Sequence, residues 1–383
     1  EIYCNNQKPP IPISRRQIAE AFLVRARDFA KEDTEIALIV TSKILYNLND
    51  KDFRKYFLSN FLITEVLEFS SVRTIMFNEA IGPGAIIFYK KGEGKKIENN
   101  EMSYYALKPN LFSEKLRIIA AEGSEVKIIA QKYLIDYDHL WKIMLNGNIL
   151  DFYFFQRMKK NYSTMATFLK ENSLLMGRGF EKGIGTNPER LELKDLRVIT
   201  TKNNKNTGGK DIFSPFFINF EKAPRIEDLY ANVEFKDQGI VACYKGPHLL
   251  IKKGTFVKNR LVLAFLDEDA AFKNSVYGIA TESSGNKKDL YYYLNGLIYS
   301  KLFVYQLFHS SAIWGIERDN FAKEEIENLS MPDSNGISSS LKNINSLVSK
   351  IITATKNNDI ISLQDSEKKL DALVYKIFDI DNI

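Results

Sequence analysis

Apolar and polar positions change their spacing repeatedly along the first ninety residues. The expected elements are helices at 14–30 and 52–61 and strands at 36–40, 63–69 and 85–89. The apolar run at 36–40 is continuous, which is typical of a strand buried on both faces of a parallel sheet. Regular alternation of helix and strand predicts an α/β fold with a doubly wound sheet over this part of the chain.

The pattern changes after residue 90. A polar, Gly-containing segment at 90–100 predicts a domain boundary, and short strands between Gly- and Asn-rich stretches then predict a mixed α+β region. A long amphipathic helix is expected at 289–309, and a Ser-rich linker at 333–340 precedes two further amphipathic helices. The expected domains are therefore residues 1–100, 101–332 and a helical tail at 333–383.

Composition narrows the class of protein without fixing its function. The 383 residues are 45% hydrophobic and 26% charged, with a net charge of +5, which is typical of a soluble globular protein with a slight bias towards polyanions. Two cysteines and three histidines are scattered, so we expect neither disulfides nor a metal site, and a cytoplasmic location. No membrane partner is expected, because no apolar run could span a bilayer. The start at Glu1 suggests a fragment of a longer protein.

Three segments carry clustered cations. Residues 201–210 and 241–260 contain no acid, and residues 176–190 place cations among four glycines, which let a backbone approach phosphate. The candidate DNA-binding residues are Arg178, Lys182, Arg190, Lys202, Lys205, Lys210, Lys245, His248, Lys252, Lys253, Lys258 and Arg260. The alternative is that these segments are ordinary solvated loops and hairpins, with glycines that only serve turns.

Several stretches resemble a known family when their order is considered. Four N-terminal stretches and four later ones match, at 17–26, 37–43, 53–58, 69–87, 294–303, 314–318, 329–332 and 370–375. The first four resemble the half of the catalytic domain that follows the Asn-Pro-Pro-aromatic motif in adenine-specific DNA methyltransferases of type I and type IIG restriction-modification systems. The later ones are similar to the target recognition region and C-terminal helix of that family.

The departures from the family pattern are equally informative. Neither a Gly-rich methyl-donor loop nor an Asn-Pro-Pro-Tyr motif occurs in the sequence, so no catalytic residue is assigned. The resemblance implies that S-adenosylmethionine binds the intact parent protein and that no cofactor binds this chain alone. A pocket for the target base is expected to involve Arg73, Trp314 and Arg318. The alternatives are a salt bridge at Arg73 and core packing at Trp314.

These observations favour the DNA-reading portion of a site-specific adenine methyltransferase. Its expected partners are double-stranded DNA and the missing N-terminal catalytic half or a methyltransferase subunit. One alternative is a DNA specificity module that docks on a separate methyltransferase through residues 1–90. Another is an unrelated small-molecule enzyme whose 176–190 loop binds phosphate.

Overall fold

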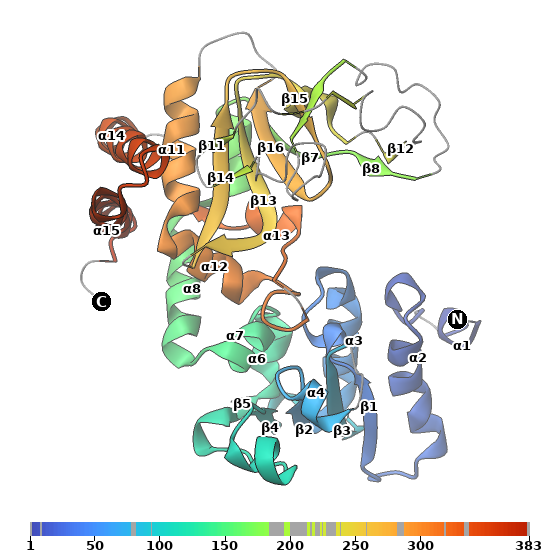
Figure 1. Cartoon of the computed structure of the whole chain (residues 1–383). Helices are drawn as coiled ribbons and strands as arrows, with labels where there is room; N and C mark the ends of the chain where they lie inside the picture. The colour runs from blue at the N-terminus through green and yellow to red at the C-terminus, as the bar shows by residue number, and fades with distance from the viewer. Residues whose placement is uncertain are drawn as a thin grey trace. The chain divides into compact units, whose positions relative to one another are not determined.

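The computed structural model describes two compact units. Unit 1 comprises Glu1–Arg157 and Phe308–Asp319, and unit 2 comprises Met158–Leu307 and Asn320–Ile383 (Figure 1). The described residues are 2–7, 10–77, 82–92, 94–183, 195–199, 213–214, 217–218, 223, 225–226, 235–237, 239–257, 259–281, 287–317, 319–332 and 337–380. Two helices, α8 (Ile149–Asn161) and α12 (Lys301–Ser310), contribute residues to both units.

Unit 1 is built around a five-stranded mixed sheet. Its strands are β1 (Ile36–Thr41), β2 (Phe61–Glu68), β3 (Gly84–Lys91), β4 (Glu101–Ala106) and β5 (Val126–Ala130). The helices are α1 (Ile2–Asn5), α2 (Ile18–Arg25), α3 (Lys51–Asn60), α4 (Arg73–Met76), α5 (Lys95–Glu98), α6 (Gln131–Asp136) and α7 (Leu140–Asn146). The strand order is β1-β3-β2-β4-β5.

The sheet direction departs from the expected parallel arrangement. Strand β3 lies between β1 and β2 and is antiparallel to both, so β1 and β2 point the same way with α3 between them in sequence. The expectation that β1 is buried on both faces is wrong, because β1 ends the strand order and Ile39 is 66% exposed. The alternation of helix and strand is confirmed, while the all-parallel pairing is not.

The sheet also continues past the boundary expected at 90–100. Strand β4 pairs in parallel with β2, and β5 pairs antiparallel with β4. Unit 1 extends to Arg157, so the polar segment at 90–100 is a connection within one unit. A polar, Gly-containing stretch marks a turn equally well whether the next strand joins the same sheet or another.

Unit 2 has a four-stranded antiparallel sheet at its centre. The strands follow the order β14-β13-β16-β7, formed by β14 (Arg260–Leu266), β13 (His248–Val257), β16 (Val276–Thr281) and β7 (Leu174–Arg178). Helix α11 (Lys288–Tyr299) packs against β13 and β14 (Figure 1). A buried cluster that includes Leu250, Val262 and Phe272 packs together in the same unit.

Smaller elements complete unit 2. They are β6 (Ser163–Thr164), α9 (Met165–Glu171), β8 (Glu181–Lys182), β9 (Arg197–Ile199), β10 (Phe213–Ser214), β11 (Phe217–Ile218), β12 (Phe235–Asp237), η10 (Val241–Tyr244), β15 (Ala270–Phe272), α13 (Lys323–Glu327), β17 (Ser330–Met331), α14 (Ile337–Lys356) and α15 (Ile360–Ile377).

The helix expected at 289–309 is divided into α11 and α12. Ser300 has extended backbone angles, and its hydroxyl accepts a hydrogen bond from the backbone N–H of Phe303 at 3.3 Å. That contact satisfies a donor that the first turn of α12 would otherwise leave unpaired. The apolar period runs through the break, which is why the sequence predicted one helix.

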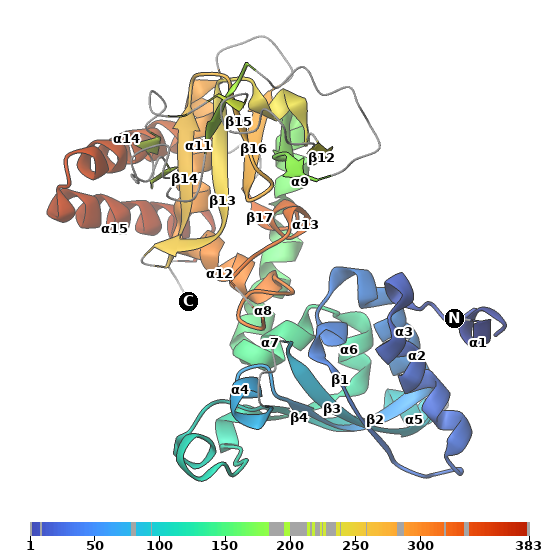
Figure 2. The ribbon, with the colours of Figure 1, turned by 45° about the vertical axis from the view of Figure 1, so that its right-hand side comes forward.

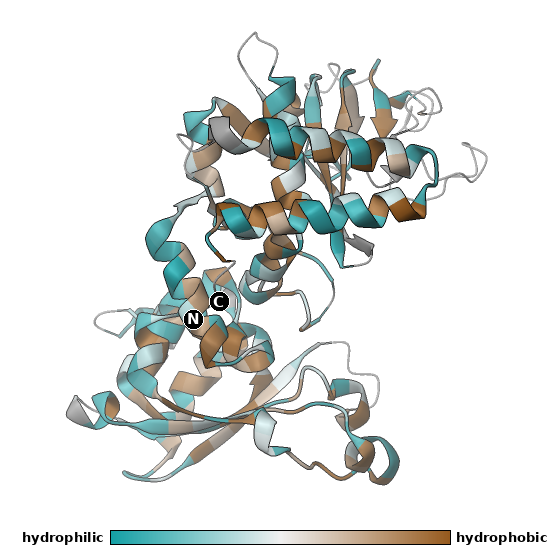
Figure 3. Ribbon diagram, turned by 90° about the vertical axis from the view of Figure 1, so that its left-hand side faces the viewer, coloured by the Kyte–Doolittle hydropathy of each residue, from teal (hydrophilic) through white to brown (hydrophobic). Residues whose placement is uncertain are grey.

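The two C-terminal helices belong to unit 2 and pack on α11. A Cβ atom at Gly296 would lie 2.4 Å from Ile344 and 3.4 Å from Leu370, so α11 approaches both α14 and α15 closely at this glycine. Figure 3 shows the apolar and polar residues that alternate along α14 and α15. Residues 337–380 are thus a part of unit 2 and not a separate helical tail.

Candidate nucleic-acid interface

The carboxyl ends of β1 and β2 meet at one edge of the unit 1 sheet and carry a buried polar cluster. The hydroxyls of Ser42 and Ser70 are 2.9 Å apart, and the backbone N–H of Ser70 donates to the Glu68 carboxylate at 3.1 Å. Glu68 is fully buried, and this burial raises the pKa of its carboxyl. Ligand sites in α/β sheets commonly form at this edge, outside the carboxyl ends of the strands.

A turn from much later in the chain covers the same region of unit 1. Arg73 donates to the carbonyl oxygens of Ile316 at 3.0 Å and Glu317 at 3.3 Å. Lys43 forms an ion pair with Glu317 at 2.8 Å, and the buried Lys142 ammonium donates to the Trp314 carbonyl. Three cations from separate elements therefore hold one turn.

Of the three residues expected around a target base, Arg73 and Trp314 lie near the same turn. Their contacts in the structure differ from the expected ones. Trp314 is buried and packs edge-on against Phe308, with ring centroids 5.4 Å apart. The expectation that its indole stacks on a base is therefore wrong, and the alternative of core packing holds. Among the described residues, Arg73 donates to carbonyl oxygens and forms no ion pair of the kind that the alternative salt bridge requires. A role of Arg73 at the base stays a prediction, and Arg318 lies outside the described residues.

Several of the expected DNA-binding cations lie at the surface of unit 2. Arg178 at the end of β7 is 51% exposed and forms an ion pair with Asp237. Lys182 on β8 and Lys245 after η10 are exposed, and Lys252 on β13 is half-buried. Positive side chains placed this way can contact phosphate without large rearrangement.

Lys253 lies over the ring of Tyr277, with its ammonium 4.1 Å from the ring centroid. Burial lowers the pKa of Lys253 to about 8, and the nearby Arg178 lowers it further. The amine is still mostly protonated at neutral pH. It can donate to an anion, and its position is fixed by the aromatic face beneath it.

His248 does not belong among the DNA-binding residues. Its side chain is completely buried, and Nδ1 lies 2.7 Å from the Cys243 carbonyl oxygen, to which a neutral ring can donate. Burial lowers the pKa of His248 to about 4. The residue is therefore an uncharged core histidine next to Phe272, at 6.1 Å between ring centroids.

Arg260 is likewise a structural residue. Its guanidinium is 3% exposed and donates to both carboxylate oxygens of Asp371, at 3.0 and 2.6 Å. It also donates to the Tyr299 carbonyl at 3.1 Å, beside the break between α11 and α12. A lysine- and arginine-rich segment gave no sign that its last cation pairs with an acid 111 residues later.

The glycines at the start of the 176–190 segment allow close packing. A Cβ at Gly179 would lie 2.0 Å from the Phe272 carbonyl oxygen, and one at Gly177 would lie 2.6 Å from Ile240. Close packing within the protein therefore explains both glycines without a bound phosphate. The other expected cations, Arg190, Lys202, Lys205, Lys210 and Lys258, lie outside the described residues.

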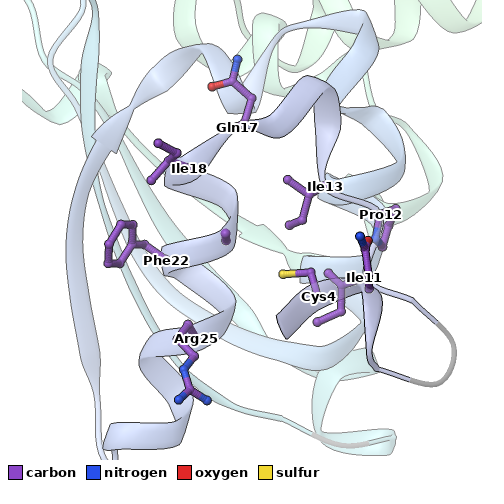
Figure 4. Close-up of a pocket in the computed structure, with 10 residues that line it drawn as sticks. Cys4, Ile11, Pro12, Ile13, Gln17, Ile18, Phe22 and Arg25 are labelled. Atoms are coloured by element: carbon purple, nitrogen blue, oxygen red, sulfur yellow. The ribbon is translucent and has the colours of Figure 1, made fainter. Parts of the chain in front are cut away.

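A cavity of about 670 Å³ opens beside α2 in unit 1. Its lining includes Cys4, Ile13, Ile18, Phe22 and Arg25 (Figure 4). The walls are mostly apolar, and Ile18 and Phe22 are largely exposed to solvent. Exposed apolar surface of this kind marks a place where another protein surface can pack.

Neither a metal site nor a membrane-spanning helix is found in the described part of the chain. No group of three or more His, Cys, Asp or Glu side chains there is arranged to hold a metal ion. Among the same residues, no helix combines the length and apolar character needed to cross a bilayer.

Comparison with known proteins gives structural likeness only. No protein-family model and no curated protein matches the chain. The solved structure of the type IIL restriction-modification enzyme MmeI in complex with DNA is similar over 94% of this chain, with 12% identity and a TM-score of 0.50. The type IIG restriction endonuclease BpuSI matches 98% of the chain, with 12% identity and a TM-score of 0.34.

The chain spans about half the length of these two enzymes, at 49% and 51%. The HsdS subunit from Thermoanaerobacter tengcongensis matches 68% of this chain and 61% of its own, with 10% identity and a TM-score of 0.22. The MmeI likeness supports a mixed α/β fold shared with part of a restriction-modification enzyme. The lower TM-scores add nothing to that conclusion.

Proposed function

We propose that this chain is the DNA-recognition portion of a site-specific adenine DNA methyltransferase of a cytoplasmic restriction-modification system. The observation that carries the proposal is the likeness to MmeI, which was solved with DNA and which this chain matches over 94% of its length. Exposed cations at Arg178, Lys182 and Lys245 add the charge that phosphate contacts require.

In this proposal the two units have different tasks. Unit 2 contacts duplex DNA through its surface cations, while unit 1 supplies the second half of a doubly wound catalytic sheet. S-adenosylmethionine would bind the intact parent protein, because the sequence contains neither an Asn-Pro-Pro-aromatic motif nor a donor loop. The chain alone then has no catalytic residue and transfers no methyl group.

The surface around α2 and β1 fits a partner half of the sheet. Among the described residues β1 pairs with β3 only, which leaves one edge of the strand open, and Ile39 is exposed. The apolar cavity at Ile18 and Phe22 adjoins α2 (Figure 4). The same surface supports the second candidate function, a DNA specificity module that docks on a separate methyltransferase subunit. A pull-down with a candidate catalytic subunit distinguishes the two.

Salt-dependent binding of duplex DNA tests the proposed function. The affinity of the 383-residue chain for a duplex should fall more than about tenfold as salt rises from about 50 to about 200 mM, because binding is favoured by the release of counterions from phosphate and added salt makes that release less favourable. Lys182→Gln and Lys245→Gln should each reduce the salt slope by about one. The matched control is Lys368→Gln, an exposed cation on α15. Binding that ignores salt, or no binding at all, would contradict DNA recognition.

A further inference from the structure

A loop of unit 1 between β4 and β5 exposes an unusual amount of apolar side chain. Leu111 is 68% and Phe112 52% exposed, and Leu116, Ile118 and Ile119 are exposed as well. Five large apolar side chains within nine positions are therefore exposed to solvent. Monomeric soluble proteins rarely leave such a patch in water unless something binds it.

Hydrogen bonds within the loop preform it. The Asn110 amide donates to the Ala120 carbonyl at 2.8 Å and so closes the neck of the loop. The side-chain Oδ1 of Asn110 accepts from the backbone N–H of Ser113 at 3.0 Å, and the hydroxyl of the buried Ser113 donates to the Asn110 backbone carbonyl at 3.0 Å. A loop that is already ordered loses less conformational entropy on binding than a flexible one.

The charge around the apolar side chains favours a polyanion as the occupant. Lys108, Lys115 and Arg117 are exposed, and Glu114 is the one acidic residue in the sequence from 107 to 121. Burial and the nearby Lys108 lower the pKa of Lys127 to about 8, while Asp151 and Glu125 oppose this shift. The surplus of positive charge therefore belongs to residues 107–121 themselves, where three cations outnumber one acid. Apolar wedges flanked by cations are the means by which architectural proteins unstack and kink duplex DNA.

The root of the loop adjoins the polar edge described above. Strand β4 is parallel to β2, so the loop leaves the sheet at the same carboxyl edge. The backbone N–H of Leu107 donates to the Glu68 carbonyl at 3.2 Å, and Leu107 packs with Phe69 and Val72. Figure 2 shows the segment after β4 extending away from the sheet.

We propose that residues 107–121 form an apolar wedge that inserts into duplex DNA, with Leu111 and Phe112 against the bases and Lys115 and Arg117 on phosphates. The inference rests on the proposed function, because it assumes that the chain binds DNA. It adds a contact made by unit 1 outside the target-base pocket that the sequence analysis expected around Arg73 and Trp314.

Two classes of variant separate the wedge from simple charge attraction. Phe112→Ala should weaken binding of a duplex about tenfold and leave the salt slope unchanged, because it removes base contact and no charge. Lys115→Gln and Arg117→Gln should each lower the salt slope by about one. The matched apolar control is Ile361→Ala on α15, which is exposed and should bind as the wild type does. All four side chains are exposed, so circular dichroism should show unchanged folding.

A duplex with 2-aminopurine at successive positions gives the direct readout. Wild-type chain should raise the fluorescence at one position, where the wedge unstacks the base, and Phe112→Ala should abolish the rise. If the wild type binds duplex in a salt-dependent way and Phe112→Ala has the same affinity and the same fluorescence rise, the wedge is overturned. The proposed function is then still supported. No duplex binding by the wild type overturns both.

Two further results would assign the patch to another partner and overturn the wedge. One is flotation with vesicles of phosphatidylserine and phosphatidylcholine that Phe112→Ala abolishes while DNA binding is unchanged. The other is a wild-type dimer in sedimentation that the same substitution dissociates, again without effect on DNA.

Discussion

Arg260→Ala is expected to lower the free energy of unfolding of unit 2 by about 3–5 kcal/mol, the usual cost of removing one partner from a buried ion pair. The substitution leaves the Asp371 carboxylate buried without its bidentate partner and removes a donor from the Tyr299 carbonyl. Asp371 also accepts from the backbone N–H of Lys301, so β14, the start of α12 and α15 should all loosen together.

Chemical denaturation can follow each unit. Both tryptophans, Trp141 and Trp314, lie in unit 1, so tryptophan fluorescence reports that unit, whereas far-UV circular dichroism reports both. Arg260→Ala should shift only the unfolding transition of unit 2, which appears in circular dichroism and not in tryptophan fluorescence. The triple variant Arg260→Met, Asp371→Leu and Glu367→Gln is the control, because it leaves no charge of the buried network unpaired and such replacement is often neutral or stabilising. Unchanged unfolding together with weakened DNA binding would show that Arg260 is a DNA contact after all.

Unit 2 is also expected to lose about 3 kcal/mol of stability as pH falls from about 7 to about 4, because of His248. The pKa of His248 is lowered by burial to about 4, against an ordinary value of 6.5. Between these two values the unfolded chain binds more protons than the folded one, so acid favours unfolding. The stability is fully present above pH 6.5 and is lost progressively below it.

Substitution at the histidine isolates this effect from general acid denaturation. His248→Gln removes the titrating ring and should flatten the dependence of the unit 2 transition on pH between about 7 and about 4.5. His309→Gln is the matched control, because His309 is a second buried histidine with a pKa of about 4 but lies in unit 1. An equally steep loss in the His248→Gln variant would show that other groups govern the acid sensitivity of unit 2.

Local patterns predicted the elements of unit 1 up to residue 90 but not their arrangement, and they predicted none of the elements from β4 to α8. The strands at 36–40, 63–69 and 85–89 occur within a few residues of their expected bounds. A run such as 36–40 reads the same whether the strand lies in the centre or at the edge of a sheet. The insertion of β3 between β1 and β2 depends on pairing across the chain, which no local period encodes.

The resemblance singled out Arg73 and Trp314, but the contacts that hold the carboxyl edge together left no signal in the sequence. Lys43, Arg73 and Lys142 converge on the turn at 314–317, and their partners are mostly backbone carbonyl oxygens. Arg54 is similar, because it pairs with Asp138, 84 residues later, at 2.7 Å. Cation-rich segments identify charge, but only tertiary contacts separate an exposed Lys182 from a buried Arg260.

Selection from a random pool of duplexes tests the central claim, that this chain recognises DNA, most directly. The 383-residue chain should enrich one sequence over successive rounds, and the enriched duplex should bind at least about tenfold more tightly than a scrambled one at the same salt, since each mismatch commonly costs about 1–3 kcal/mol. Equal binding of enriched and scrambled duplexes, or no enrichment, would contradict a role in target recognition.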